Sequence, residues 1–261
     1  MSSARVSVSV ETWRDISSPD VASAVIERVL AEGEGFAFDR MGHEEPLKRR
    51  FRPEDAATLW AENTSTRDSL EVGWFIAEKK TQPHGSMMAH WQRKPRGLWL
   101  NWISLWADEE YFRTAEKIQR VLDLMAELSH FVGSGYGLGH HDAERKAKGW
   151  VDEILPGGRK AKTTITLKSQ EGLIDLWWAN LFGPPYVDLF GEERIQNCPA
   201  REVRKIGAKA YLVLTAPTPF DWSLQEAREL QERAKRHLGL EAFFDRDNPS
   251  RKPSAPVWPP E

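Results

Sequence analysis

Histidine and carboxylate residues gather in one short stretch of the chain, and these residue types are common metal ligands. His140, His141 and Asp142 are consecutive, and Glu144 follows two positions later. Adjacent side chains point apart on most backbones, and no second ligand pair at suitable spacing completes a tetrahedral site. We therefore predict neither a metal nor a cofactor here, and we expect a polar loop in contact with solvent.

Three other patterns contain residue types used in catalysis but lack the spacing that catalysis requires. The glycine-rich run 133–139 follows a long helix, whereas the glycines of a dinucleotide-binding loop precede one. The Glu-Lys-Lys triplet at 78–80 needs a carboxylate from an earlier strand to hold Mg²⁺, but Asp68 precedes the same strand. Cys198 has no base beside it in the sequence, so we expect an inert thiol. These patterns predict that the protein is not an enzyme.

Two further histidines, His84 and His90, lie on or beside one predicted strand. Their even separation places both side chains on the same face of that strand. The sequence places no carboxylate in register with either histidine, so we expect ordinary polar strand residues and not an acid–base pair.

The elements that must position these residues are recognisable from hydrophobic periodicity. Three apolar runs at 70–78, 85–91 and 97–106 are separated by short turn sequences, which predicts antiparallel strands. The third run is apolar at several positions on both faces, so we expect it near the centre of its sheet. Apolar residues at helical spacing predict amphipathic helices at 108–130 and 224–238.

Shorter patterns complete the outline of the fold. The segments 163–167 and 209–215 have the composition of strands. The polar stretch 140–162 predicts a short helix followed by a surface loop. Together, these elements predict an α+β fold in which antiparallel sheets are covered by amphipathic helices.

The order of these elements also predicts how the chain is divided. We expect a single α+β domain at residues 1–247, and the order of its elements allows two similar halves at 1–140 and 160–247. The segment 248–261 contains five prolines, so we expect a flexible tail.

Composition restricts the classes of function. The chain has 261 residues and a net charge of −3, from 36 basic and 39 acidic side chains, which is too balanced to predict nucleic-acid binding. Its one cysteine cannot form an internal disulfide bond, and this favours the cytoplasm. No window approaches about 18 consecutive apolar residues, so we predict no membrane span.

The most distinctive segment is an aromatic run at 177–191, which a Gly-Pro-Pro sequence interrupts. The two prolines cannot donate to a sheet and must lie at an edge, a turn or a helix start. The residues after the first proline predict one helical turn, closed by glycine, that presents Tyr186 and Asp188 at the surface. Such aromatic residues are typical of the centres of protein interfaces. Burial in a core stays open as an alternative for the two tryptophans and Phe182.

Residues 178–193 read Trp-Ala-Asn-Leu-Phe-Gly-Pro-Pro-Tyr-Val-Asp-Leu-Phe-Gly-Glu-Glu. This segment, followed by an apolar strand and a closing amphipathic helix, resembles the immunity protein 52 family, bacterial antidotes that accompany polymorphic toxins. The pattern is also compatible with the related immunity proteins of type VI secretion systems. The resemblance implies an α+β fold, no catalysis, and a cognate toxin, often a nuclease, as partner. It supplies no contact residues.

We therefore predict a cytoplasmic immunity protein that binds a toxin one to one and occludes its active site, without a nucleic-acid or membrane partner. Buried rings would supply affinity, and charges at the rim would steer the encounter. The predicted partner-binding residues are Tyr186, Asp188, Glu192 and Glu193 at the surface, with Trp178 and Asn180 holding the turn. The alternative functions are a hydrolase-type enzyme without a recognisable motif and a structural or adaptor subunit of an assembly.

Overall fold

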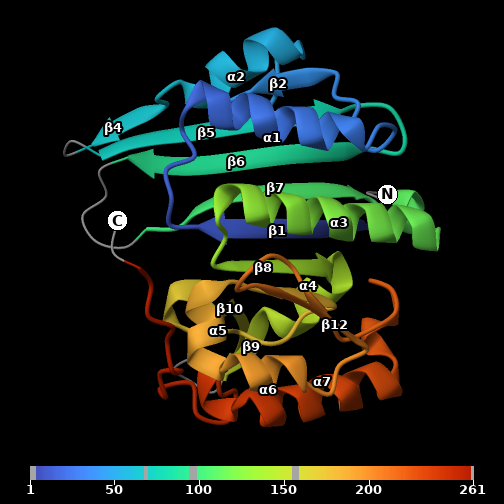
Figure 1. Cartoon of the computed structure of the whole chain (residues 1–261), viewed down its shortest axis with the longest axis vertical. Coiled ribbons are helices and arrows are strands. Elements are labelled where there is room, and N and C mark those ends of the chain that lie inside the picture. The colour runs from blue at the N-terminus through green and yellow to red at the C-terminus, as the bar shows by residue number, and fades with distance from the viewer. Residues whose placement is uncertain (1–3, 68–69, 94–98, 155–158, 260–261) are drawn as a thin grey trace. The chain divides into compact units, whose positions relative to one another are not determined.

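The chain divides into two compact units in the computed structural model (Figure 1). The first unit comprises Met1–Leu138 together with Trp258–Glu261, and the second comprises Gly139–Val257. The structure describes residues 4–67, 70–93, 99–154 and 159–259. Asp68 and the first two residues of the run predicted at 97–106 lie outside the described residues.

An antiparallel sheet forms the centre of the first unit. Its strands are β1 (Arg5–Thr12), β2 (Arg40–Gly42), β3 (Arg49–Arg50), β4 (Ser65–Arg67), β5 (Leu70–Lys79), β6 (Gly85–Arg93) and β7 (Asn101–Asp108). They lie in the order β1-β7-β6-β5-β2-β3, and β4 pairs with β5. β7 lies between β1 and β6, which confirms the central position predicted from its apolar residues on both faces.

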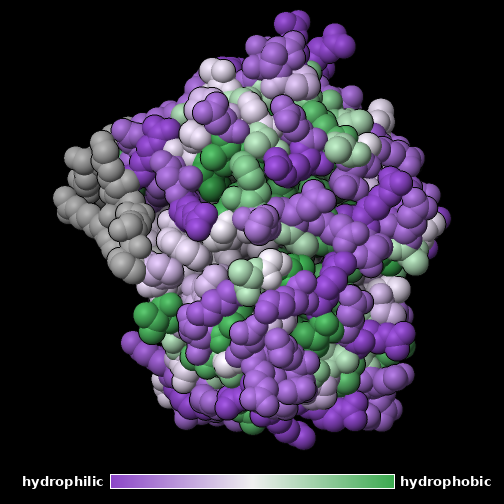
Figure 2. Space-filling model, in the orientation of Figure 1, coloured by the Kyte–Doolittle hydropathy of each residue, from purple (hydrophilic) through white to green (hydrophobic). Residues whose placement is uncertain are grey.

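Three helices of the first unit gather on one face of this sheet: α1 (Pro19–Ala31), α2 (Pro53–Ala61) and α3 (Ala115–Val132) (Figure 1). α1 contacts both other helices, and α3 packs on β1. Hydrophilic side chains dominate the outer surface of these helices in Figure 2. The apolar stripes of the helices therefore point towards the sheet, as amphipathic periodicity predicts.

The helix predicted at 108–130 begins later than expected. Its acidic first residues form a separate 3₁₀ turn at Glu109–Phe112. Thr114 then starts α3, because its side chain accepts a hydrogen bond from the amide of Lys117 at 3.3 Å. Gly133 ends α3 in the left-handed conformation, with a φ of 63°, as the glycine-rich run predicts.

Alternating burial along the strands defines the core of the first unit. The valines of β1 are buried towards the helices, whereas the serines between them are partly exposed. Two indole groups connect the sheet to α2 and to the segment before α1. Trp91 donates to the carbonyl of Trp60 at 2.8 Å, and Trp60 donates to the carbonyl of Ile16 at 2.8 Å. Both rings are fully buried, so each polar tip has the partner that burial requires.

The second unit contains antiparallel strands and short helices. β8 (Tyr136–His141) contains the boundary between the two units. The elements that follow are α4 (Asp142–Lys148), β9 (Trp150–Ile154), β10 (Lys160–Thr164), β11 (Ala179–Phe182), α5 (Pro184–Phe190), α6 (Glu192–Gln196), β12 (Glu202–Lys205), β13 (Tyr211–Leu214) and α7 (Gln225–Leu238). β13 pairs with β11 and with β12, and β9 pairs with β10.

The polar stretch 140–162 contains more regular structure than its sequence predicts. A short helix, α4, is present as expected, but β9 and the start of β10 replace the predicted surface loop. The strand predicted at 163–167 is displaced, because β10 ends at Thr164, which pairs with Trp150. Pairing with β9 stabilises polar residues that have little strand preference of their own.

Both units combine antiparallel strands with helices, and this confirms the α+β class. Among the described residues, no helix is long and apolar enough to cross a bilayer. The proline-rich segment that begins at Asn248 forms no helix or strand as far as Pro259. The amide of Ser254 nevertheless donates to the carbonyl of Glu241 at 2.7 Å. The division into one domain and a flexible tail stays a prediction.

Candidate functional site

The aromatic run forms a strand and a short helix, and a second short helix follows it. Trp177 and Trp178 precede the strand, β11, and the Gly-Pro-Pro sequence then lets Pro184 and Pro185 occupy the first turn of α5. Proline suits this position because the first amides of a helix have no partner within it. Gly191, with a φ of 87°, ends α5 and precedes α6. The helical turn predicted after the prolines is therefore confirmed.

Tyr186 does not reach the surface, contrary to the prediction. Its side chain is fully buried, and its hydroxyl donates to the carbonyl of Ser169. Its ring packs against Phe182 and Phe190 at centroid distances of 5.9 and 5.7 Å. Tyr186 and Phe190 are four residues apart and share one face of α5. Phe190 is also buried, so that face packs into the unit's core and takes Tyr186 with it.

Trp178 and Asn180 are also fully buried. Asn180 accepts a hydrogen bond from the amide of Trp177 at 2.8 Å and donates to the carbonyl of the same residue at 2.7 Å. These bonds fix the backbone where it enters β11. The two residues can support the aromatic run, but in this arrangement neither offers its side chain to a partner.

The predicted acidic residues do lie at the surface, and two of them are neutralised locally. Asp188 pairs with Lys209 at 2.5 Å, and Glu192 pairs with Lys205 at 2.8 Å. The hydrogen bond from Lys205 lowers the pKa of Glu192. Glu193 is exposed, and no ion pair of its side chain occurs among the described residues. This patch therefore presents little net negative charge to a partner.

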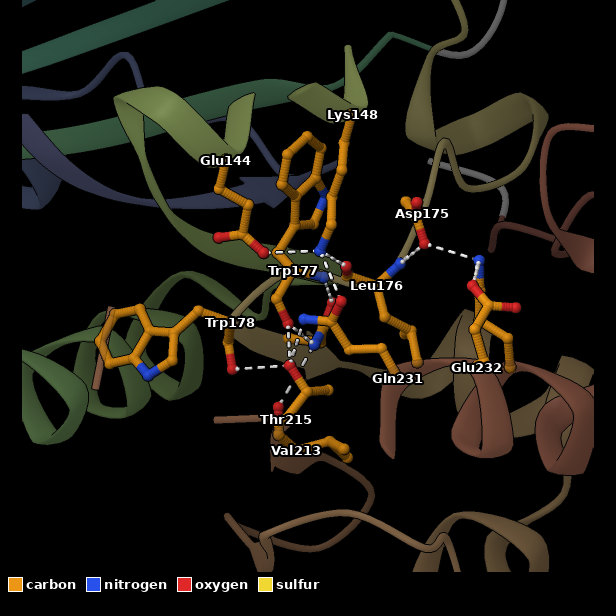
Figure 3. A network of polar contacts seen from close by, with 12 residues as sticks. Glu144, Lys148, Asp175, Leu176, Trp177, Trp178, Val213, Thr215, Gln231 and Glu232 are labelled. Carbon is orange, nitrogen blue, oxygen red and sulfur yellow. Dashed lines mark hydrogen bonds and ion pairs between the residues drawn. The ribbon is translucent and has the colours of Figure 1, made fainter. Parts of the chain in front are cut away.

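Beneath the aromatic run lies a buried polar network, which we call the Lys148 network (Figure 3). Lys148, on α4, donates to the carboxylate of Glu144 at 2.6 Å, the carbonyl of Leu176 at 2.5 Å and the side-chain oxygen of Gln231 at 2.9 Å. The ammonium group has three N–H donors, and all three have acceptors. Burial raises the pKa of Glu144, and the positive charge of Lys148 opposes that effect.

Thr215 and Gln231 extend this network to β11 (Figure 3). Gln231, on α7, donates to the hydroxyl of Thr215 at 2.8 Å, and that hydroxyl donates to the carbonyl of Trp177 at 2.8 Å. The network thus joins α4, α7 and the strands around the aromatic run. Because its donors are engaged with protein acceptors, its evident role is to hold these elements together.

The two adjacent histidines occupy different environments. His140 is buried against Trp177 at a centroid distance of 5.5 Å, and burial lowers its pKa to about 4. The Nδ1 atom of His141 accepts from the amide of Ala143 at 3.1 Å and caps α4. Within the described part of the chain, no three histidine, cysteine or carboxylate side chains form a group that could hold a metal ion.

Sequence reasoning missed a second aromatic surface, on the face of the first unit's sheet opposite α1, α2 and α3. We call it the tryptophan face, and it consists of Trp74, Met88, His90, Trp102, Ser104 and Trp106. All of these side chains except His90 are partly exposed. The signal was present in the alternation of the third predicted strand, where tryptophan and serine occupy every second position. Because the strand is apolar at several positions on both faces, the sequence alone does not show which of its rings are exposed.

The register of the strands brings these residues into rows. His90 lies opposite Trp74 on β5 and opposite Trp102 on β7, at centroid distances of 4.4 and 5.8 Å. Burial among these rings lowers the pKa of His90 to about 4, so its imidazole is neutral at pH 7. At the end of the face, the guanidinium group of Arg5 lies 3.8 Å from the ring centroid of Trp106.

His84 has the carboxylate partner that the sequence did not reveal. Its Nδ1 atom lies 2.8 Å from Asp108 Oδ2, and the same oxygen accepts from the amide of His84 at 3.0 Å. Asp108 ends β7 and faces the turn before β6, so the contact depends on pairing between strands and not on sequence spacing. Among the described residues, no carboxylate pairs with His90, and its buried Nδ1 atom makes no hydrogen bond.

A cavity of about 640 Å³ lies at one edge of the first unit and borders Trp74. His43 and Glu62 line it, with the Nε2 atom of His43 3.0 Å from the carboxylate of Glu62. The Lys148 network does not line this cavity. Cys198 does not line it either, and burial raises the pKa of its thiol to about 12, which suits the predicted inert thiol.

Taken together, these features define an α+β protein whose sheet carries helices on one face and half-exposed tryptophans on the other in its first unit. No protein-family model and no curated protein sequence matches the chain. A solved structure described as the Pseudomonas aeruginosa type VI secretion system (T6SS) protein PA0821 is similar to it, with a TM-score of 0.53 and 10% sequence identity. The similarity covers 89% of this chain and 73% of that chain. At this identity, the likeness concerns the fold.

Proposed function

We propose that this chain is an immunity protein that binds and neutralises a cognate bacterial toxin and acts in the cytoplasm without catalysis of its own. The observation that carries the proposal is the likeness in fold to a T6SS protein over 89% of the chain. The resemblance of residues 178–193 to the immunity protein 52 family points in the same direction. The mechanism would be occlusion of the toxin's active site through one-to-one binding.

The Lys148 network does not have the features of a hydrolytic site. A hydrolytic site needs titratable groups that a substrate can reach. Glu144 is fully buried, and the ammonium group of Lys148 is engaged with three protein acceptors. The buried acid and base of the second unit therefore act on each other and not on a ligand.

Co-expression in a bacterial host tests the proposal. The C-terminal domain encoded by the adjacent gene, which is the expected toxin, is expressed with and without the protein, and the surviving cells are counted. We expect survival only with the protein, together with a stable complex in gel filtration. Toxicity that the protein does not relieve would contradict the proposal and shift attention to the hydrolase and adaptor functions.

A further inference from the structure

The centre of the tryptophan face has the chemistry of a protein-binding surface. Trp74, Trp102 and Trp106 supply large rings, and Met88 supplies a flexible apolar side chain. These residue types are enriched in the cores of protein interfaces, from which charged residues are depleted. None of these six residues carries a formal charge at pH 7, since His90 is neutral there. The charged neighbours on β1 are Arg5 beside Trp106 and the half-exposed Glu11 opposite Trp102.

The rings of this face are held in place before any partner arrives. Trp74 and Trp102 meet edge to face at a centroid distance of 5.5 Å, and His90 stacks on Trp102. Each ring also stands on a paired strand whose neighbours fix its direction. A surface fixed in this way loses little conformational entropy on binding, and this favours affinity.

One end of the face carries a cation that lacks a carboxylate partner. The guanidinium group of Arg5 is stacked on Trp106, the residue is exposed, and no carboxylate pairs with it among the described residues. By contrast, lysines neutralise Asp188 and Glu192 on the predicted patch. Charge complementarity therefore favours a partner that places a carboxylate beside Arg5.

We propose that the tryptophan face, and not the predicted patch of Asp188, Glu192 and Glu193, is the surface that docks the cognate toxin. The proposal rests on the proposed immunity function. The toxin would place an apolar side chain against Trp102 and Ser104 and a carboxylate against Arg5. A buried apolar contact with one charged pair at its rim is a common arrangement in specific complexes.

Binding measurements with matched variants test this surface. Arg5→Ala and Trp102→Ala alter the tryptophan face, and the probe is the toxin domain encoded beside the gene. Arg28→Ala is the matched control, because its guanidinium group also stacks on a ring, that of Phe131 at 4.4 Å, but on the helical face. A second control, Asp188→Ala with Glu193→Ala, removes two of the three carboxylates of the predicted patch. Circular dichroism and urea unfolding verify that each variant is folded.

We expect the dissociation constant to rise about thirtyfold for Trp102→Ala and about tenfold for Arg5→Ala, as for residues at an interface centre and a charged rim. Both controls should bind like the wild type.

If the wild type protects cells and the folded variants of the tryptophan face bind the toxin as tightly as the wild type, the proposed docking surface is wrong and the immunity function stands. If the wild type neither binds nor protects, both proposals fail. If Arg5→Ala dissociates a homodimer without affecting toxin binding, the face joins two copies of this chain, and the toxin-docking proposal is wrong.

Discussion

At the scale of single residues, burial sets the protonation state of two histidines. It lowers the pKa values of His90 and His140 to about 4, whereas both are ordinary histidines in the unfolded chain. Between about pH 6.5 and pH 4, the unfolded state therefore binds more protons than the folded state. The free energy of unfolding is therefore highest above this pH range and falls as the pH decreases through it.

We expect the substitution His90→Phe to weaken this pH dependence. Each neutral buried histidine costs the wild type up to about 1.4 kcal/mol of unfolding free energy per pH unit below pH 6.5. Urea unfolding at pH 7 and pH 5 should show a smaller loss of stability in the variant than in the wild type. Equal losses in both proteins would mean that His90 is protonated in the folded state.

Tyr186 belongs to the core, so we expect its substitution to affect stability before it affects binding. Tyr186→Phe removes the hydrogen bond to Ser169 and should lower the unfolding free energy by about 1 kcal/mol. Tyr186→Ala also leaves a cavity between Phe182 and Phe190 and should lower it by about 3–5 kcal/mol. Thermal unfolding measures both effects. A stable Tyr186→Ala variant with lost toxin binding would instead restore the surface role predicted from the sequence.

At the scale of elements, the Lys148 network connects α4, α7 and the segment before β11 through one ammonium group. A buried pair of opposite charges adds little net stability when intact, but the loss of one partner leaves the other uncompensated. Glu144 is fully buried, so it cannot recover its hydration when Lys148 is replaced.

We expect Lys148→Met to lower the unfolding free energy by about 3–5 kcal/mol. The double variant Glu144→Leu with Lys148→Met should lose less than Lys148→Met alone, because no unpaired charge is left in the core. Urea unfolding of the two single variants and the double variant gives the coupling energy. Additive losses would contradict a direct interaction between the two side chains.

The elements with strong periodicity could be predicted from the sequence, and those that depend on pairing could not. Apolar runs correctly located β5, β6 and β7, and helical periodicity correctly located α7. β9 mixes apolar and acidic residues and β10 is largely polar, and their stability depends on mutual pairing that no local pattern reveals. The predicted exposure of Tyr186 was wrong for a related reason. The sequence predicts a helical turn, but it does not show which face of that turn packs against a strand.

At the scale of the whole molecule, the net charge of −3 suggests how the complex should respond to salt. Contacts centred on an uncharged aromatic surface are screened little, whereas charge pairs at an exposed rim are screened strongly. The pair with Arg5 lies at the exposed rim and should be screened, so we expect the toxin dissociation constant to rise, but by less than about tenfold, between about 50 and 500 mM salt. A change of tenfold or more would favour docking through charged residues such as Glu193.

The hydrogen bonds that link Trp91 to Trp60, and Trp60 to Ile16, have a consequence for exchange with heavy water. Both indole protons are buried within the core of the first unit, so they exchange only when that core opens. The half-exposed indoles of Trp102 and Trp106 lack this protection. In NMR spectra recorded after dilution into deuterium oxide, we expect the indole signals of Trp60 and Trp91 to outlast those of Trp102 and Trp106. Their rate of disappearance would report the free energy of opening of this unit alone.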